Sequence, residues 1–144
     1  MNTPATFVLP KTNEIVQVVT IDAETLKAFF VKETLKHFKN KTEYGNISYL
    51  EGVPGPTDMV DIYAVYHCFE MKAFAIVPTY VKSVLSRIYV SDDFRNKGVA
   101  TLLINQLQIK SLGCVSDNTT ALSLYSTLGF KVVQKGVFTN NLER

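Results

Sequence analysis

The sequence predicts one domain of mixed α and β structure, on three observations. Its 144 residues match the usual size of a single domain. With 47% hydrophobic and 19% charged residues, the chain has enough apolar material for a core and does not resemble a disordered protein. Segments with a two-residue hydrophobic repeat alternate with segments whose repeat is near 3.6 residues. The expected fold class is therefore α/β or α+β, in one domain that spans residues 1–144.

The N-terminal part predicts a strand, a helix and a loop. Residues 14–20 suit a strand, and Asp22 can cap the helix that follows. In that helix the large apolar side chains fall on one face, namely Leu26, Phe29, Phe30 and Phe38. Residues 39–58 carry Gly, Pro and Asn at the density of a loop.

The middle of the chain predicts three successive antiparallel strands. Residues 60–90 are rich in β-branched and aromatic side chains, and this run is broken at residues 70–72 and 78–82. A polar turn over residues 91–98 then leads into a short helix beginning at Val99.

The C-terminal part predicts a strand, a helix and a hairpin. A strand is expected near residues 109–115, and either Asp117 or Asn118 can cap the next helix. Gly129 stands where that helix is expected to end, and the alternating residues after it are typical of a terminal hairpin. The apolar positions of the helix recur at helical spacing and are Ala121, Leu124, Tyr125 and Leu128.

Several classes of protein are made less plausible by what the sequence lacks. No apolar run approaches the roughly 18 residues that a membrane span needs, and the N-terminus has no secretory pattern. We therefore expect a soluble, cytoplasmic protein. Cys68 and Cys114 have neither metal-ligand spacing nor the density of a disulfide framework, so both are expected to be reduced core residues.

Charge is unevenly distributed along the chain. The net charge is only +2, and no nucleic-acid recognition motif is present, so binding to nucleic acid is not expected. Residues 42–71 contain five acids and no base, whereas residues 72–144 contain nine bases and four acids. This asymmetry is compatible with a protein that binds a cationic group on one side and an anionic group on the other. It is equally compatible with ordinary charged side chains that only face solvent.

The junction between the third strand and the next helix suggests an anion site. Backbone N–H groups at a helix N-terminus attract phosphate, and Gly98 allows close approach to the main chain. Arg95 and Lys97 add cations at its rim. The spacing matches neither the phosphate loop of nucleotide hydrolases nor the dinucleotide fingerprint. By itself, a glycine at this position is also compatible with an ordinary turn.

Two motifs together resemble the GNAT superfamily of acetyl-CoA-dependent N-acetyltransferases. The first motif is R-x-x-G-x-A, formed by Arg95, Gly98 and Ala100. The second motif lies in the stretch that begins with Asp117, 17 residues after Ala100. It has the pattern N-x-x-A-x-x-x-Y-x-x-x-G-F and is formed by Asn118, Ala121, Tyr125, Gly129 and Phe130. The resemblance implies acetyl-CoA as the acetyl donor and a strongly twisted mixed sheet flanked by helices. Neighbouring strands would splay apart between residues 88–90 and residues 112–115.

The resemblance also implies which residues bind the coenzyme. The strand would hold the thioester, the turn would hold the diphosphate, and Asn118 would bind the coenzyme arm or fix its turn. Tyr125 would donate a hydrogen bond to the leaving sulfur, since its ordinary pKa of about 10 exceeds the value of about 8.5 for a thiol. The implied coenzyme-binding residues are Ile88, Tyr89, Val90, Arg95, Asn96, Lys97, Gly98, Val99, Ala100, Asn118 and Tyr125.

One departure from the family pattern concerns the helix after Gly98. Only 19 residues separate Gly98 from Asp117, so we expect about three helical turns, almost no loop before the next strand, and a shallower coenzyme slot on that side.

The general base is not evident from the sequence. The strand at residues 81–90 contains no carboxylate. The candidates are therefore Glu70, Asp61, His67 and an ordered water, of which we favour the water.

The acceptor is expected to be a primary amine of a small molecule or protein, and the chain a monomer or homodimer. Acids and tyrosines between residues 43 and 63 could receive a cationic amine such as a polyamine, an aminoglycoside, a protein lysine or a protein N-terminus. These residues are Glu43, Tyr44, Tyr49, Glu51, Asp58, Asp61 and Tyr63. The missing strand carboxylate and the short helix also leave open a catalytically inactive module of the same fold that binds acyl-CoA or blocks a partner.

Overall fold

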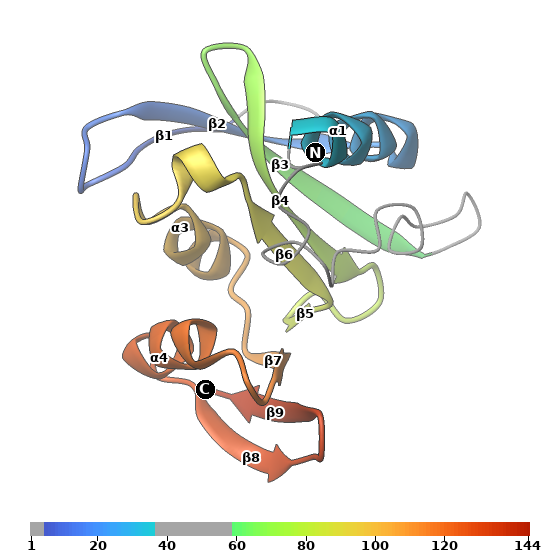
Figure 1. Ribbon diagram of the computed structural model, residues 1–144, viewed down its shortest axis with the longest axis vertical. Helices are drawn as coiled ribbons and strands as arrows, with labels where there is room; N and C mark the ends of the chain where they lie inside the picture. The colour runs from blue at the N-terminus through green and yellow to red at the C-terminus, as the bar shows by residue number, and fades with distance from the viewer. Residues whose placement is uncertain (1–4, 37–58) are drawn as a thin grey trace.

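The computed structural model describes residues 5–36 and 59–144, which form two β-sheets, three α-helices and one 3₁₀ helix (Figure 1). The larger sheet has the order β1-β2-β3-β4-β6 and is antiparallel throughout. The smaller sheet has the order β5-β7-β9-β8, and only its β5–β7 pair is parallel. The strands are β1 (Ala5–Val8), β2 (Ile15–Ile21), β3 (Val60–His67), β4 (Glu70–Pro78), β5 (Val84–Leu85), β6 (Arg87–Val90), β7 (Ser111–Val115), β8 (Lys131–Lys135) and β9 (Thr139–Glu143). The expected mixed fold is therefore confirmed.

Helix α1 (Ala23–Lys36) begins where the sequence predicts. The Asp22 carboxylate accepts the backbone N–H of Thr25 at 2.8 Å, which satisfies one of the free donors at the helix start. Leu26, Phe29 and Phe30 are buried against the larger sheet, as expected from their spacing. Phe38 and the loop predicted at residues 39–58 lie outside the described residues. The description resumes at Met59, which directly precedes β3. Strand β1 was not predicted.

The β3–β4 hairpin differs from the prediction at its turn. The turn lies at Cys68 and Phe69, whose φ angles are 51° and 66°, whereas the sequence predicts the break at residues 70–72. Those residues instead begin β4. Because Cys68 occupies the hairpin tip, it is exposed, so its prediction as a core residue is wrong. Cys114 is buried as expected, and both cysteines are free.

Strands β5 and β6 form a splayed edge. Leu85 pairs with Leu112 of β7, and the N–H of Ser86 then bonds to the carbonyl oxygen of Ile76 in β4 at 2.8 Å. From Arg87 onward, β6 pairs with β4, and β7 continues in the other sheet. The segment of residues 84–90 thus belongs to the smaller sheet at its start, as β5, and to the larger sheet at its end, as β6. This confirms the expected splay, and within residues 5–36 and 59–144 the edge of β6 that faces β7 has no strand partner.

The C-terminal half carries the remaining helices. Helix α3 (Val99–Gln106) has eight residues, slightly more than two turns, and is shorter than the three turns expected. The connection to β7 is only four residues, residues 107–110, as the sequence suggested. Helix α4 (Thr119–Thr127) ends before Gly129, whose φ of 94° places it in the left-handed conformation expected of a helix stop. The predicted terminal hairpin is formed by β8 and β9.

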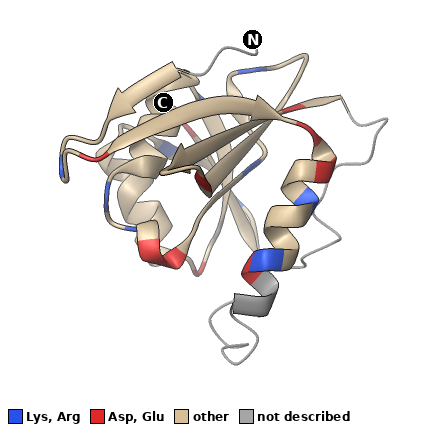
Figure 2. Ribbon diagram, turned by 90° about the horizontal axis from the view of Figure 1, so that it is seen from above, with Lys and Arg blue, Asp and Glu red and all other residues tan. Residues whose placement is uncertain are grey.

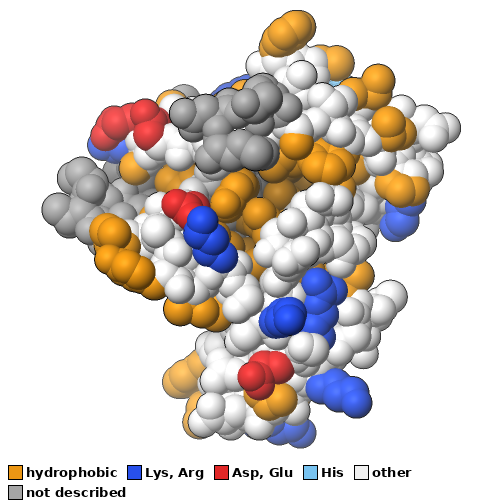
Figure 3. Space-filling view, turned by 180° about the vertical axis from the view of Figure 1, so that it is seen from behind, with side chains coloured by type: hydrophobic (Ala, Val, Ile, Leu, Met, Phe, Trp, Pro, Cys, Tyr) orange, Lys and Arg blue, Asp and Glu red, His pale blue; other side chains and the backbone are white. Residues whose placement is uncertain are grey.

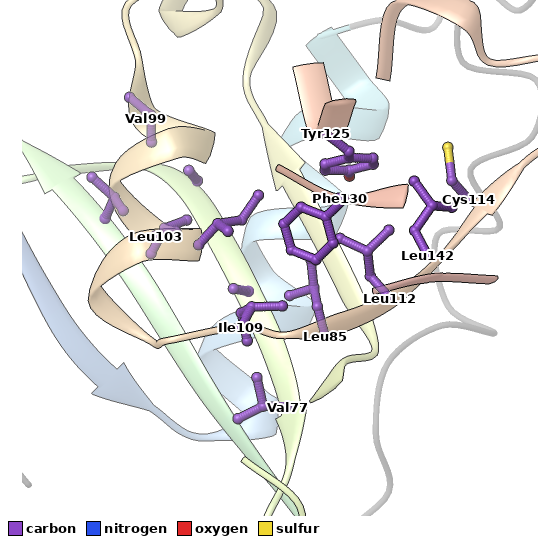
Figure 4. Close-up of a cluster of buried hydrophobic side chains, with 14 of the residues drawn as sticks. Val77, Leu85, Val99, Leu103, Ile109, Leu112, Cys114, Tyr125, Phe130 and Leu142 are labelled. Carbon is purple, nitrogen blue, oxygen red and sulfur yellow. The ribbon is translucent and has the colours of Figure 1, made fainter. Parts of the chain in front are cut away.

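Two groups of buried side chains lie on opposite sides of the larger sheet. One lies under α1 and includes Phe30 and Phe74. The other joins the larger sheet to α3, α4 and the smaller sheet, where Leu103, Phe130 and Leu142 come together (Figure 4). This second group fixes the two motif helices relative to β6.

Charged residues are spread over the ribbon, and acids and bases both occur along α1 (Figure 2). On the face shown in Figure 3 the basic and acidic side chains are likewise interspersed. Within residues 5–36 and 59–144, no helix combines the length and hydropathy needed to cross a bilayer.

Candidate active site

A cavity of about 580 Å³ lies where β6, the start of α3 and the start of α4 meet. The 3₁₀ helix η1 (Asp92–Phe94) connects β6 to the turn before α3. Ten of the eleven residues that the sequence predicts for coenzyme binding line this cavity. The lining also includes residues that the sequence did not assign to coenzyme binding, namely Lys11, Phe94, Thr101, Thr120, Ala121 and Leu124. The splayed edge of β6 therefore forms one wall, and the two motif helices form the others.

The turn at the start of α3 presents backbone donors to the cavity. Gly98 is the N-cap residue, its φ is 87°, and it supplies no side-chain cap. The first backbone bond of the helix runs from the N–H of Leu102 to the carbonyl oxygen of Gly98, at 3.0 Å. The N–H groups of Val99, Ala100 and Thr101 come before this first bond and therefore have no acceptor within the helix. All three residues line the cavity. The geometry of this helix start is suited to binding an anion.

Gly98 is required for its backbone conformation rather than for space. A Cβ atom added there would meet nothing within 4 Å, so a side chain would not collide with neighbours. Asn96 also has a positive φ, of 62°. Two residues of the turn between η1 and α3 thus have the left-handed conformation, which glycine adopts without strain.

The side chains of the two cations near the turn, Arg95 and Lys97, point in different directions. Arg95 lines the cavity, donates from Nε to the Val90 carbonyl oxygen at 2.9 Å and lies 5.7 Å from the centre of the Tyr89 ring. Lys97 instead donates to the Glu14 carboxylate at 2.8 Å, and this hydrogen bond lowers the pKa of Glu14. The side chain of Lys97 is the one predicted coenzyme ligand that does not line the cavity.

Tyr125 lines the cavity from α4 and is only 7% exposed. Its ring packs against Phe130 with centres 6.0 Å apart, next to Leu142 and Cys114 (Figure 4). Burial, with a smaller contribution from Cys114, raises the pKa of the phenol to about 12. Among the described residues, none accepts a hydrogen bond from its hydroxyl group. Tyr125 therefore offers a protonated and unused donor at neutral pH.

Asn118 both caps α4 and lines the cavity. Its side-chain oxygen accepts the backbone N–H of Ala121 at 3.1 Å, so it is Asn118 rather than Asp117 that begins the helix. The capping role predicted as one alternative is thus present, and the side-chain amide remains beside the cavity.

The carboxylates proposed as bases do not line the cavity. Glu70 pairs with Lys32 at 2.7 Å and with Lys72 at 3.6 Å near the β3–β4 turn. Asp61 faces Lys82 at 3.7 Å and accepts a bond from Thr79 at 3.4 Å.

His67 also lies outside the cavity lining. Its Nε2 atom is 3.3 Å from the Glu14 carboxylate, and its ring packs against Phe94. The acceptor residues predicted between 43 and 58 lie outside the described residues.

A buried acid that the sequence reading missed lies on the other side of β6. Glu33 of α1 is 4% exposed, and its Oε1 atom accepts hydrogen bonds from Tyr89 Oη at 2.9 Å and Ser91 Oγ at 2.6 Å. The sequence does carry a signal for it, because Glu33 follows Leu26 by seven residues and Phe30 by three. It thus occupies a core position of an apolar helix face.

The fold is shared by many solved acetyltransferases. The GNAT domain of S. lividans PAT has a TM-score of 0.62 at 16% identity, with 98% of this chain and 97% of that chain covered. The PaiA N-acetyltransferase from Thermoplasma acidophilum, solved with coenzyme A, has a TM-score of 0.60 at 12% identity, with coverages of 90% and 98%. The spermidine/spermine N-acetyltransferase SpeG from Vibrio cholerae has a TM-score of 0.58 at 11% identity, with coverages of 88% and 91%.

Sequence comparison gives the family directly. No curated protein matches the chain. The family model described as an acetyltransferase (GNAT) domain matches residues 61–132, which is half of the chain and includes β6, α3, β7 and α4. The chain therefore belongs to the GNAT family, whose members are N-acetyltransferases that use acetyl-CoA.

Proposed function

We propose that this enzyme transfers the acetyl group of acetyl-CoA to a primary amine by direct attack in a ternary complex. One observation carries the proposal: a single cavity has free helix N–H groups at one end and the unused phenol of Tyr125 on a facing helix. The first feature suits a diphosphate, and the second suits a sulfur atom that gains negative charge.

The main chain would supply much of the coenzyme site. The diphosphate would accept hydrogen bonds from the amides of residues 96–100, with the cations of Arg95 and Lys11 at the rim. The thioester arm would run along residues 88–90, because the β7-facing edge of β6 has no strand partner. Main-chain groups on that edge can bond to the arm as a neighbouring strand would.

Acetyl transfer would proceed in one substitution at the thioester carbonyl. The neutral amine attacks the carbonyl carbon, the new C–N bond forms, and the C–S bond breaks with the electron pair leaving on sulfur. The nitrogen then gives up one further proton to solvent water, which leaves the neutral amide and the thiolate. Because the pKa of Tyr125 is about 12 and that of a thiol is about 8.5, the phenol would keep its proton and donate a hydrogen bond to the thiolate. Such a bond to a charged group contributes about 1.5–3 kcal/mol, or roughly 10- to 100-fold in rate.

The ammonium form of the acceptor must lose a proton before attack. We propose that an ordered water removes it, since Glu70 and Asp61 are each occupied by a lysine away from the cavity. An amine that arrives partly neutral needs only weak assistance from a base.

Mass measurement on acceptors tests this proposal. The full chain is incubated with acetyl-CoA and a panel of polyamines, aminoglycosides, amino acids and cell-extract proteins, and products are examined for the gain of one acetyl group. We expect at least one primary amine to be acetylated. Tight coenzyme binding without turnover of any acceptor would contradict the proposal and favour an acyl-CoA-binding module of the same fold.

A further inference from the structure

The turn between β1 and β2 brings a lysine to the coenzyme cavity. Lys11 lines the cavity, although β1 is the edge of the larger sheet opposite β6. The turn lies beside the loop that precedes α3 (Figure 1), and Glu14 at its end accepts a hydrogen bond from Lys97 at 2.8 Å. Because Lys97 directly precedes Gly98, Lys11 approaches the cavity at the end where the first N–H groups of α3 lie.

The β1–β2 turn is held in place by its own backbone and by the core. The N–H of Leu9 bonds to the carbonyl oxygen of Glu14 at 2.9 Å, and the N–H of Asn13 bonds to the carbonyl oxygen of Leu9 at 2.8 Å. Leu9 is completely buried and belongs to the same core group as Leu103 of α3. The position of Lys11 near α3 thus rests on backbone bonds and packing as well as on the ion pair at the end of the turn.

The ammonium group of Lys11 is not engaged by an acid of the described residues. The side chain is exposed, and within residues 5–36 and 59–144 no carboxylate lies within ion-pair distance of it. Glu14, the acid of the same turn, is paired with Lys97 at 2.8 Å and with His67 at 3.3 Å. The charge of Lys11 is therefore free to act on a ligand.

The cavity as a whole is suited to a ligand with several negative charges. Its sixteen lining residues within the described part of the chain include two cations, Lys11 and Arg95, and no acid. Arg95 is directed toward β6, because its Nε atom donates to the Val90 carbonyl oxygen at 2.9 Å. The two cations thus serve different parts of the cavity, and Lys11 is the one that comes from the β1–β2 turn.

Coenzyme A carries two kinds of phosphate that make different demands on a protein. The groups of the diphosphate are diesters, and under the proposed function they bond to the N–H groups at the start of α3. The 3′-phosphate on the ribose is a monoester with a charge of about −2 at neutral pH, and it lies on the far side of the diphosphate from the thioester. A compact ammonium group on a flexible stem suits such a group. Lys11 lies at the corresponding end of the cavity.

We propose that Lys11 binds the 3′-phosphate of the coenzyme and makes the enzyme prefer CoA to its 3′-dephosphorylated form. The inference rests on the coenzyme site of the proposed function and adds to it a residue that determines specificity. It assigns this role to the β1–β2 turn, which lies outside both sequence motifs.

The test compares two ligands that differ only in the 3′-phosphate. Calorimetry with the full chain gives the Kd for CoA and for 3′-dephospho-CoA at low salt. We expect the wild type to bind CoA about three- to tenfold more tightly, which lies between the effects of an exposed ion pair and of a desolvated charge-assisted bond. Lys11→Gln should abolish this preference by weakening CoA alone, and should leave the Kd for 3′-dephospho-CoA within about twofold. Lys11→Arg keeps the charge and should keep a preference of at least about threefold.

Lys135→Gln is the matched control for the loss of one positive charge. Lys135 is an exposed lysine of β8 and does not line the cavity. We expect this variant to leave both Kd values within about 1.5-fold. The Tm of each variant shows whether the fold is retained.

Three outcomes would overturn the inference and leave the proposed function intact, because CoA still binds in each of them. The first is an equal Kd of the wild type for the two ligands. The second is an equal loss for both ligands in Lys11→Gln, which would place the ammonium group at the diphosphate. The third is the same loss of preference in Lys135→Gln, which would indicate a general effect of net charge. Failure of the wild type to bind either ligand would overturn the proposed function together with the inference.

Discussion

The two sides of strand β6 carry different kinds of polar groups. On the cavity side, Gly98 and the first amides of α3 supply main-chain donors from one short stretch of sequence. On the α1 side, Glu33 and Arg87 are single side chains separated by more than fifty residues along the chain. The comparison predicts that backbone changes at the turn impair coenzyme binding more than side-chain changes near α1 do.

The largest expected effect is on the coenzyme side. Gly98→Val places a β-branched residue at a φ of 87°, which costs about 1–3 kcal/mol and moves the N–H groups of the turn. We expect affinity for CoA to fall roughly 10- to 100-fold, as measured by calorimetry.

Gly129→Val is the matched control for that change. Gly129 has a similar φ of 94°, and a Cβ there would also meet nothing within 4 Å. It does not line the cavity. Equal losses of CoA affinity in the two variants would mean that general backbone strain, not the anion site, accounts for the effect.

The next effect concerns the hydroxyl of Tyr125. Tyr125→Phe should lower kcat roughly 10- to 100-fold because the hydrogen bond to the leaving sulfur is lost, with little change in the Kd for CoA. Tyr80→Phe, on an exposed ring, should leave both values unchanged. If the kcat of Tyr125→Phe equals that of the wild type, the phenol has no role in the mechanism.

Burial of Tyr125 also predicts a dependence of stability on pH. In the folded protein its pKa is about 12, whereas an unfolded tyrosine ionises near pH 10. The folded state binds this proton more tightly, so its contribution is complete below about pH 10 and is lost as pH rises through about 12. We expect the wild type to lose about 2 kcal/mol more than Tyr125→Phe over this interval in urea titrations. Parallel losses in the two proteins would contradict the predicted shift.

On the α1 side, Glu33→Gln is expected to change the stability of the protein. Replacing a buried carboxylate that has no cation partner among the described residues by a neutral amide is expected to raise the free energy of unfolding by about 1 kcal/mol, or Tm by roughly 4 °C. Calorimetric melting of the ligand-free protein measures this change. A clear fall in Tm would show that the carboxylate serves chiefly to hold Tyr89 and Ser91 in place.

The smallest effect is expected at Lys97, whose side chain pairs with Glu14 away from the cavity. Lys97→Ala should change the Kd for CoA by less than about threefold, because the residue contributes to the turn through its main chain. A larger loss would mean that the ammonium group turns toward the ligand when coenzyme binds.

The sequence predicted features that local chemistry determines. The Asp22 cap, the Asn118 cap and the left-handed Gly129 follow from short-range rules, and each appears where its residue type indicates. Ten of the sixteen residues that line the cavity were singled out for coenzyme binding from two compact motifs and the strand before them.

What the sequence did not reveal depends on long-range placement. The turn at Cys68 was missed because neither residue at its tip is a usual choice for a positive φ. The Lys97 side chain points away from the cavity because it pairs with Glu14, which is 83 residues away in the chain. The burial of Glu33 became evident only when α1 was packed on β6, although its heptad position was visible in the sequence.

The central claim is that the amides at the start of α3 hold the coenzyme diphosphate. At 16.1 kDa the protein is small enough for amide NMR, and titration with CoA and with pantetheine, which lacks the diphosphate, tests the claim at single residues. We predict that CoA shifts the amide signals of residues 96–101 more than those of any other described segment, and that pantetheine leaves them unchanged while moving residues 88–90. If the largest CoA-dependent shifts lie elsewhere, or if pantetheine moves the turn as CoA does, the claim is wrong.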